Sequence, residues 1–326
     1  MKRRIAIGLV VATVLATPFS IFSVFSQQVA LADDSQVTEA PTLPSTSLVA
    51  LPSLVDEPVP ANVTPSLSNI SADRPKPYKD RCHTQQDMSK SESSCIYGNL
   101  KSKTTVVLFG DSHALSWFPA IERLVIAKKW RLVSLTMSSC WPADILAWNS
   151  TKNALMPNCT IWREEAFQDI LAMKPSIIFV AGTKGFSTVD GDLNLILGAD
   201  RTTTWEAGMM RTLDTLKQAS KRVIYLSDTP VSTVNSATCL QAHLDSIEAC
   251  ATPYAKAVSP NWIAEEHHVA TIEGITWVDP TPWICSTNPC SPLSGKYVIY
   301  VDGGHLTATF AWTLEKPLWT ELTATP

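Results

Sequence analysis

The stretch Thr104-Thr105-Val106-Val107-Leu108-Phe109-Gly110-Asp111-Ser112-His113 decides how this chain folds. Its first six residues form an unbroken run of β-branched and apolar side chains, which is typical of a strand buried on both faces. Gly110 ends the run, and apolar residues at helical spacing follow from 115 to 128. The stretch therefore predicts a buried strand, a tight turn and a helix.

The same alternation of apolar run and helical pattern repeats along the chain. Further strands are predicted at residues 131–136, 176–181, 222–227 and 271–278, and further helices at 162–173, 205–220 and 253–268. Continuous apolar strands separated by helices indicate a parallel sheet covered on both faces. The predicted fold class is α/β, a single doubly wound, flavodoxin-like sandwich with a mainly parallel sheet. In such folds ligands bind at the carboxyl ends of the strands, so chemistry is expected in the loops that follow them.

Two segments of different composition precede this domain, which we place at residues 79–326. Residues 1–32 have a basic start, an apolar stretch and Ala30-Leu31-Ala32 as a small-x-small cleavage site, as in an export signal peptide. An uncleaved N-terminal membrane anchor is the alternative, because about 20 apolar residues can span a bilayer. Residues 33–78 are rich in Pro, Ser and Thr and predict a disordered linker. Both interpretations of the first segment place the domain in an extracytoplasmic compartment, secreted or anchored at the cell envelope.

Charge and cysteine content narrow the function classes. The formal net charge is −4, with 26 basic and 30 acidic residues, so no long-range attraction for nucleic acid is expected. The eight cysteines fit an oxidising compartment. Eight cysteines allow 105 connectivities, and the simplest arrangement joins neighbours along the chain: Cys82 with Cys95, Cys140 with Cys159, Cys239 with Cys250, and Cys285 with Cys290. A structural zinc site is disfavoured because the chain has no Cys-x-x-Cys and no His at zinc spacing.

Two motifs far apart in the chain carry the chemistry. Ser112 follows the first predicted strand and opens a helix, where free backbone N–H groups can stabilise an oxyanion. Asp302 and His305 lie three residues apart before a C-terminal apolar helix, a spacing that lets the carboxylate orient the imidazole. Together they predict a serine nucleophile, its base and the residue that orients the base. The alternative for Ser112 is a helix N-cap without chemistry.

These residues resemble the SGNH/GDSL hydrolase superfamily. Gly110-Asp111-Ser112 matches its first motif block, and Asp302 with His305 matches the Asp-x-x-His of its last block. Gly-Asp-Ser-His and Asp-x-x-His-Leu-Thr narrow the resemblance to extracytoplasmic SGNH domains associated with acyltransferase-3 membrane proteins that O-acetylate glycans. Ser138-Ser139-Cys140-Trp141-Pro142 resembles the second block of that subgroup, and Cys159-Thr160-Ile161-Trp162 the start of its next helix.

The chain departs from the superfamily pattern at the two remaining oxyanion donors. No second-block glycine is evident, and Ser139 is the closest stand-in. The third-block Gly-x-Asn is absent, because the strand runs into Ala181-Gly182-Thr183. The third donor is therefore unassigned, with Thr183 as the candidate. Losing one such donor can cost about 2.7–4 kcal/mol of transition-state stabilisation.

The resemblance implies an exported, serine-dependent acyl transfer, an O-acetyltransferase acting on a surface glycan through a Ser–His–Asp acyl-enzyme. A separate membrane acyltransferase is then the expected source of acetyl groups. Hydrolysis of O-acetyl groups by a carbohydrate acetylesterase is the first alternative, and a non-catalytic glycan-binding module the second. No metal or cofactor is expected. Among nearby polar residues, Asp111 is expected to bond turn amides, His113 to pack or position substrate, and Glu265-Glu266 to be exposed helix charges.

Overall fold

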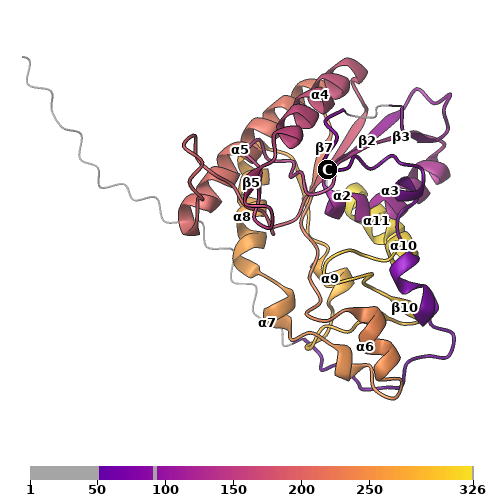
Figure 1. Cartoon of the computed structure of the whole chain (residues 1–326). Coiled ribbons are helices and arrows are strands. Elements are labelled where there is room, and N and C mark those ends of the chain that lie inside the picture. The colour runs from indigo at the N-terminus through magenta and orange to yellow at the C-terminus, as the bar shows by residue number, and fades with distance from the viewer. Residues whose placement is uncertain (1–50, 91–93, 325–326) are drawn as a thin grey trace, which may run out of the picture. The chain divides into compact units, whose positions relative to one another are not determined.

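The computed structural model describes residues 51–90 and 94–324, whose centre is one six-stranded sheet in the order β1-β3-β2-β6-β7-β8 (Figure 1). Its strands are β1 Ile96–Gly98, β2 Thr105–Gly110, β3 Arg131–Thr136, β6 Ile177–Ala181, β7 Val223–Leu226 and β8 Thr276–Val278. All pairings are parallel except that of β1 with β3. Counting only the parallel strands, the order is the flavodoxin-like 2-1-3-4-5, as predicted.

Helices cover both faces of the sheet (Figure 1). One face packs on a buried cluster that includes Leu115, Phe118 and Phe310, and the other on a cluster that includes Trp162, Trp205 and Met209. The long helices are α3 Phe118–Lys128, α4 Pro157–Met173, α5 Gly198–Ala219, α8 Pro260–Glu273 and α11 Glu315–Ala324. Strands β2 and β6 are buried along their whole length, because each lies between two helical layers.

Short elements complete the described part of the chain. The helices are η1 Leu67–Ala72, α1 Lys76–Lys79, α2 Ser112–Ser116, α6 Ser236–Ala242, η2 Glu248–Cys250, α7 Tyr254–Ala257, α9 Thr281–Ile284 and α10 Ala308–Thr313. Two small antiparallel pairs join β4 Trp148–Asn149 with β5 Ala154–Leu155, and β9 Leu293–Ser294 with β10 Tyr297–Val298. Within the described ranges no helix is both long and apolar enough to cross a bilayer.

Prolines and a glycine divide three of the predicted elements. The expected helix at 115–128 is two helices, α2 and α3, because Pro119 has no N–H to continue the ladder. Pro260 likewise starts α8 separately from α7. The strand expected at 271–278 is shorter, since α8 runs to Glu273 and Gly274 caps it with φ +62° before β8 begins.

The structure differs from the expected disordered linker over residues 51–78. Ile70 is fully buried in a cluster with Leu240 and Val298, so this segment contributes to the hydrophobic core. The backbone N–H of Val59 donates to the carbonyl of Leu244, and that of Thr64 to the carbonyl of Lys296. Its prolines limit regular structure to the short helices η1 and α1, and the long-range contacts order the remainder of the segment. Residues 1–50 lie outside the described residues, and with them the predicted export segment.

All four predicted disulfides are present, each between neighbours along the chain. Cys140 and Cys159 are buried, and their bond ties the loop after β3 to the start of α4. This loop carries Ser139, one of the residues predicted at the site. The disulfide therefore restrains a segment that lies at the carboxyl edge of the sheet.

Candidate active site

Ser112 is the first residue of α2, directly beyond the carboxyl end of β2. Gly110 makes the turn possible: its φ is +144°, and a Cβ there would lie 1.9 Å from the carbonyl oxygen of Ala181 on β6. Only glycine allows this close approach of the two strands. The backbone N–H of Ser112 is in the first turn of a helix, where it has no intrahelical acceptor.

Asp111 fixes this turn, as the sequence predicted. Its fully buried carboxylate accepts hydrogen bonds from the backbone N–H groups of His113, Ala114 and Thr183. Burial raises the pKa of Asp111, although the charge of His113 and these N–H donors act in the opposite direction. The side chain thus connects the loop after β2 to the loop after β6.

The structure brings together the three residues predicted to carry the chemistry. The Nε2 atom of His305 lies 2.8 Å from the Oγ atom of Ser112. Its Nδ1 atom lies 3.0 Å from both carboxylate oxygens of Asp302. These are the two contacts that a base needs, one to the nucleophile and one to the group that orients the ring.

Asp302 is held as a carboxylate by its own loop. The backbone N–H groups of Gly304 and His305 both donate to its Oδ1 atom. Partial burial favours the neutral acid, but the hydrogen bonds from the His305 ring and from these N–H groups outweigh it and lower the pKa of Asp302 below its ordinary value. Arg74 adds a contact of 3.3 Å from Nη2 to the Oδ2 atom of Asp302.

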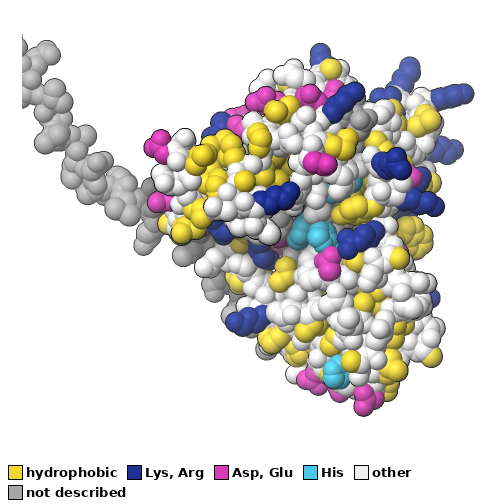
Figure 2. Space-filling model, in the orientation of Figure 1, with side chains coloured by type: hydrophobic (Ala, Val, Ile, Leu, Met, Phe, Trp, Pro, Cys, Tyr) yellow, Lys and Arg dark blue, Asp and Glu magenta, His cyan; other side chains and the backbone are white. Residues whose placement is uncertain are grey.

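A second histidine–carboxylate pair lies beside the first. The Nδ1 atom of His113 is 2.7 Å from Asp228, which follows β7, and the His113 and His305 rings are 4.9 Å apart between centroids. Burial by itself lowers the pKa of His113, but the Asp228 carboxylate outweighs this effect and raises the pKa to about 9. Figure 2 shows histidine side chains gathered at the centre of one face, beside basic and acidic side chains.

Glu266 is buried, which corrects the prediction that Glu265-Glu266 are exposed helix charges. Its Oε1 atom accepts hydrogen bonds from the Tyr225 hydroxyl and from the backbone N–H of Asp228. Burial raises the pKa of Glu266 to about 8. The face of α8 that carries Glu266 packs on the sheet, so this carboxyl group supports the loop that presents Asp228.

The two residues predicted to complete the oxyanion hole, Ser139 and Thr183, differ in the hydrogen bonding of their backbone N–H groups. Ser139 adopts φ +54° in the loop after β3, and no hydrogen bond from its backbone N–H is present within the described residues. The backbone N–H of Thr183, in contrast, donates to Asp111 at 2.9 Å. Its Oγ1 atom accepts a hydrogen bond from Gly185. Of the two donor groups of Thr183, only the hydroxyl has no acceptor among the described residues, so it is the donor left for a ligand.

The comparisons with known proteins agree with this architecture. The sequence profile described as "SGNH domain (fused to AT3 domains)" matches residues 81–319. The chain belongs to this SGNH family. Among curated proteins, none matches the sequence of the chain.

Solved structures of low sequence identity resemble this chain. The periplasmic domain of a lipopolysaccharide acetyltransferase from Salmonella ser. Paratyphi A is 14% identical with a TM-score of 0.57, covering 80% of this chain and 98% of that one. A putative acylhydrolase from Bacteroides fragilis is 13% identical with a TM-score of 0.40, covering 73% and 92%. An acetyl-xylooligosaccharide esterase variant from Geobacillus stearothermophilus is 13% identical with a TM-score of 0.39, covering 69% and 96%. At 14% identity, the Salmonella domain supports the fold of this chain and nothing beyond the fold.

Sequence reasoning missed three members of the site: Arg74, Asp228 and Glu266. Arg74 lies in the segment that composition assigned to a linker, and Asp228 is 115 residues from its partner His113. A weak signal existed for Asp228, because it follows a predicted strand at the edge of the sheet where ligands bind. No comparable signal marks Arg74 or Glu266.

Proposed function

We propose that this SGNH domain transfers acyl groups, most simply acetyl, to a hydroxyl of a cell-envelope glycan, with Ser112 as the nucleophile. The observation that carries the proposal is the contact of 2.8 Å between His305 Nε2 and Ser112 Oγ, with Asp302 on the other ring nitrogen. The SGNH family membership of the chain supports it. A binding module needs no such aligned set.

In the proposed reaction, Ser112 Oγ attacks the acyl carbonyl carbon while His305 Nε2 takes its proton. The departing alkoxide then leaves with that proton, and the acyl group remains bonded to Ser112. A glycan hydroxyl next gives its proton to His305 and attacks the acyl carbon, which breaks the bond to Ser112 Oγ and returns the proton to it. Asp302 holds the ring in the tautomer that both steps need.

The backbone N–H groups of Ser112 and Ser139 are proposed to hold the negative charge of the tetrahedral intermediates, with the hydroxyl of Thr183 as the third donor. Ser112 lies at the start of α2, beyond the carboxyl end of β2, and Ser139 lies in the loop beyond the adjacent strand β3. A donor aimed at the developing charge contributes more than one aimed at the ground-state carbonyl. The Cys140–Cys159 disulfide is proposed to keep Ser139 in place.

The proposal places the domain in the extracytoplasmic compartment, consistent with its four disulfides. The matching family is described as fused to AT3 domains, and the Salmonella neighbour is described as the periplasmic domain of a lipopolysaccharide acetyltransferase. We therefore propose a membrane acyltransferase as the partner that delivers the acyl group.

The test of the nucleophile is labelling of the full chain with a fluorophosphonate probe. We expect a single label on Ser112, and none in the Ser112→Ala variant. Labelling that persists in that variant would contradict the assignment.

The test of transfer uses an activated acetyl ester with and without glycan oligosaccharide. Transfer requires that a positioned sugar hydroxyl react faster than water, which is present in large excess. We expect slow hydrolysis alone, faster turnover with oligosaccharide, and an acetylated oligosaccharide by mass spectrometry. Release of acetate from acetylated glycan, with no acetylated acceptor at any oligosaccharide concentration, would show that the protein is an acetylesterase and not a transferase. Retention of glycan with neither product would indicate a binding module.

A further inference from the structure

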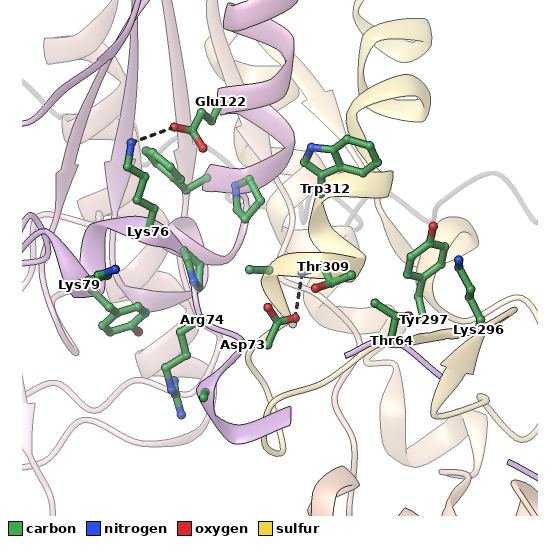
Figure 3. Close-up of a pocket in the computed structure, with 16 residues that line it drawn as sticks. Thr64, Asp73, Arg74, Lys76, Lys79, Glu122, Lys296, Tyr297, Thr309 and Trp312 are labelled. Carbon is green, nitrogen blue, oxygen red and sulfur yellow. Dashed lines mark hydrogen bonds and ion pairs between the residues drawn. The ribbon is translucent and has the colours of Figure 1, made fainter. Parts of the chain in front are cut away.

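A cleft of about 900 Å³ lies next to the candidate active site (Figure 3). It lies between the segment 64–79, the start of α3, helix α10 and β10. Its volume is within the range of ligand pockets. Neither Ser112 nor His305 lines it, so it is a separate concavity that adjoins the catalytic set on the Asp302 side.

The walls of the cleft are fastened to each other. The backbone carbonyl and the side chain of Asp73 accept hydrogen bonds from the backbone N–H groups of Ala308 and Thr309, at the start of α10. At the other end, the backbone of Thr64 bonds to Lys296 and Val298. The cleft is thus preformed, which reduces the ordering that a ligand must cause.

The cleft connects to the catalytic set through Arg74. This side chain lines the cleft, and its Nη2 atom contacts Asp302. The guanidinium also lies over the Tyr78 ring, at 5.6 Å from the centroid, and Tyr78 lines the cleft as well. Helix α10 begins within three residues of His305. A saccharide held in the cleft would therefore adjoin the Arg74–Asp302 contact without occupying the position of Ser112.

The charge of the cleft is opposite to that of the whole chain. Its lining has four basic and two acidic side chains, Arg74, Lys76, Lys79 and Lys296 against Asp73 and Glu122. Lys76 pairs with Glu122 at 3.7 Å, and Arg74 pairs with Asp302. Lys79 and Lys296 are exposed and form no ion pair with any described residue. They leave positive charge available to a ligand on a protein whose formal net charge is −4.

Aromatic side chains provide the second kind of contact. Trp312 is 49% exposed, and the Arg123 guanidinium covers its ring at 3.4 Å from the centroid. Tyr297 and Tyr78 are half-buried in the lining. Figure 3 shows Trp312, Tyr297 and Lys296 on one side of the cleft, with Lys76 and Lys79 on the other. Rigid aromatic surfaces suit the apolar C–H faces of sugar rings, and the lysines suit carboxylate or phosphate substituents.

We infer that this cleft binds an anionic stretch of the acceptor glycan, adjacent to the sugar whose hydroxyl reacts at Ser112. The inference rests on the proposed function, because it assigns the cleft to the acceptor of that reaction. Contacts to this non-reacting stretch would position the hydroxyl against the acyl-enzyme and favour it over water.

The experiment measures equilibrium binding by titration calorimetry with the full chain carrying Ser112→Ala, so that no turnover occurs. The probes are hexagalacturonate as the anionic saccharide and maltohexaose as the neutral one. We expect hexagalacturonate to bind at least tenfold more tightly than maltohexaose, and its affinity to fall as salt is raised. Equal affinity for the two probes, or no binding of hexagalacturonate, overturns the inference.

Two variants locate the binding. In the Ser112→Ala background, Lys79→Ala with Lys296→Ala is expected to weaken hexagalacturonate binding at least tenfold, and Trp312→Ala to do the same. The matched controls are Lys101→Ala with Lys316→Ala, which remove the same charge from exposed positions outside the cleft, and Ile272→Ala, which truncates an exposed apolar side chain on α8. Wild-type affinity in the lysine pair variant, or an equal loss in the lysine controls, overturns the inference.

Failure of this inference and failure of the proposed function give different results. The binding titration needs no nucleophile, whereas fluorophosphonate labelling needs no glycan. Labelling of Ser112 without saccharide binding rejects the cleft and keeps the acyl chemistry. Saccharide binding that depends on Lys79 and Lys296, without labelling of Ser112, keeps the cleft as a saccharide site and rejects its role in acyl transfer.

Discussion

Two histidine–carboxylate pairs lie side by side in this protein and differ in almost every physical respect. Asp302 and His305 are three residues apart, with side chains 33% and 27% exposed and a contact of 3.0 Å. Asp228 and His113 are 115 residues apart, with side chains 1% and 14% exposed and a contact of 2.7 Å. The two imidazole rings are nevertheless only 4.9 Å apart.

The difference supports the proposed role of the Asp302–His305 pair in proton transfer. His305 has its second nitrogen on the Ser112 hydroxyl and its ring partly open to solvent. His113 is paired with a buried carboxylate that also accepts the backbone N–H groups of Lys184 and Thr229. The Asp228 carboxylate outweighs the effect of burial and raises the pKa of His113 to about 9, so this ring keeps its proton at neutral pH. One pair is suited to proton transfer, and the other to holding a fixed charge.

The largest expected effect is on turnover, when each of the two histidines is replaced by alanine. His305→Ala removes the base, and we expect turnover of an activated acetyl ester to fall by about 10⁴-fold or more, because members of such a set act as a unit. Steady-state kinetics on the purified chain measure it, with circular dichroism to verify folding. A similar loss in His113→Ala, with His305→Ala active, would reverse the roles given to the two pairs.

The next effect compares the two carboxylates. Asp302→Asn retains the shape of the loop but disturbs the tautomer of His305, and we expect turnover to fall by roughly 10³–10⁴-fold. The matched variant Asp228→Asn acts on the buried pair and is expected to cost far less. The comparison fails if the two variants lose turnover equally while both remain folded.

A smaller effect is expected when the fixed charge is removed. His113→Gln leaves the buried Asp228 carboxylate without its cation, next to the His305 ring. We expect the turnover of an activated acetyl ester to fall by about 10–100-fold, because breaking a buried ion pair leaves an uncompensated charge. Asp228→Asn removes that carboxylate, and we expect it to lose less turnover. Wild-type turnover in a folded His113→Gln variant would leave His113 a packing role only.

The smallest effect concerns stability. The pKa of His113 is raised from 6.5 to about 9 on folding, so its contribution to stability is complete below about pH 6.5 and is lost as pH rises through about 9. The free energy of unfolding of the wild type should therefore exceed that of His113→Gln by about 1–3 kcal/mol near pH 6, and the gap should narrow toward pH 9. Urea denaturation at several pH values measures it. A gap that widens with pH contradicts the charged state of His113.

Sequence patterns predicted the parts of the fold that depend on local interactions. The strands β2, β3, β6 and β7 were predicted to within one residue of their observed ends. An unbroken apolar run is shielded from water on both faces only in a sheet that has helices on both sides, so such a run is a strong strand signal. Strand β1 was missed, since three residues at a sheet edge carry no periodicity. The order of residues 51–78 was missed because it depends on contacts with residues more than 150 positions away.

Local sequence motifs likewise predicted some features of the candidate site and not others. Ser112, Asp302 and His305 were proposed as the reacting set because each stands in a short motif whose turn or spacing has a direct chemical meaning, and the structure brings the three side chains into contact. Asp111 was assigned to turn amides for the same reason, and its contacts confirm it. The burial of Glu266 was predicted incorrectly, because the pattern of α8 alone does not show which of two adjacent carboxylates faces the sheet.

The sequence by itself predicted the α/β alternation, the four disulfides between neighbouring cysteines and the three residues proposed to carry the chemistry, because each prediction depends on groups close together along the chain. Only the tertiary structure decided that His305 meets Ser112, that Arg74 contacts Asp302, and that Asp228 binds His113. These contacts join residues brought together by the parallel sheet and by the packing of residues 51–78. Their energies depend on burial and distance, which are properties of the folded chain and not of any short segment of it.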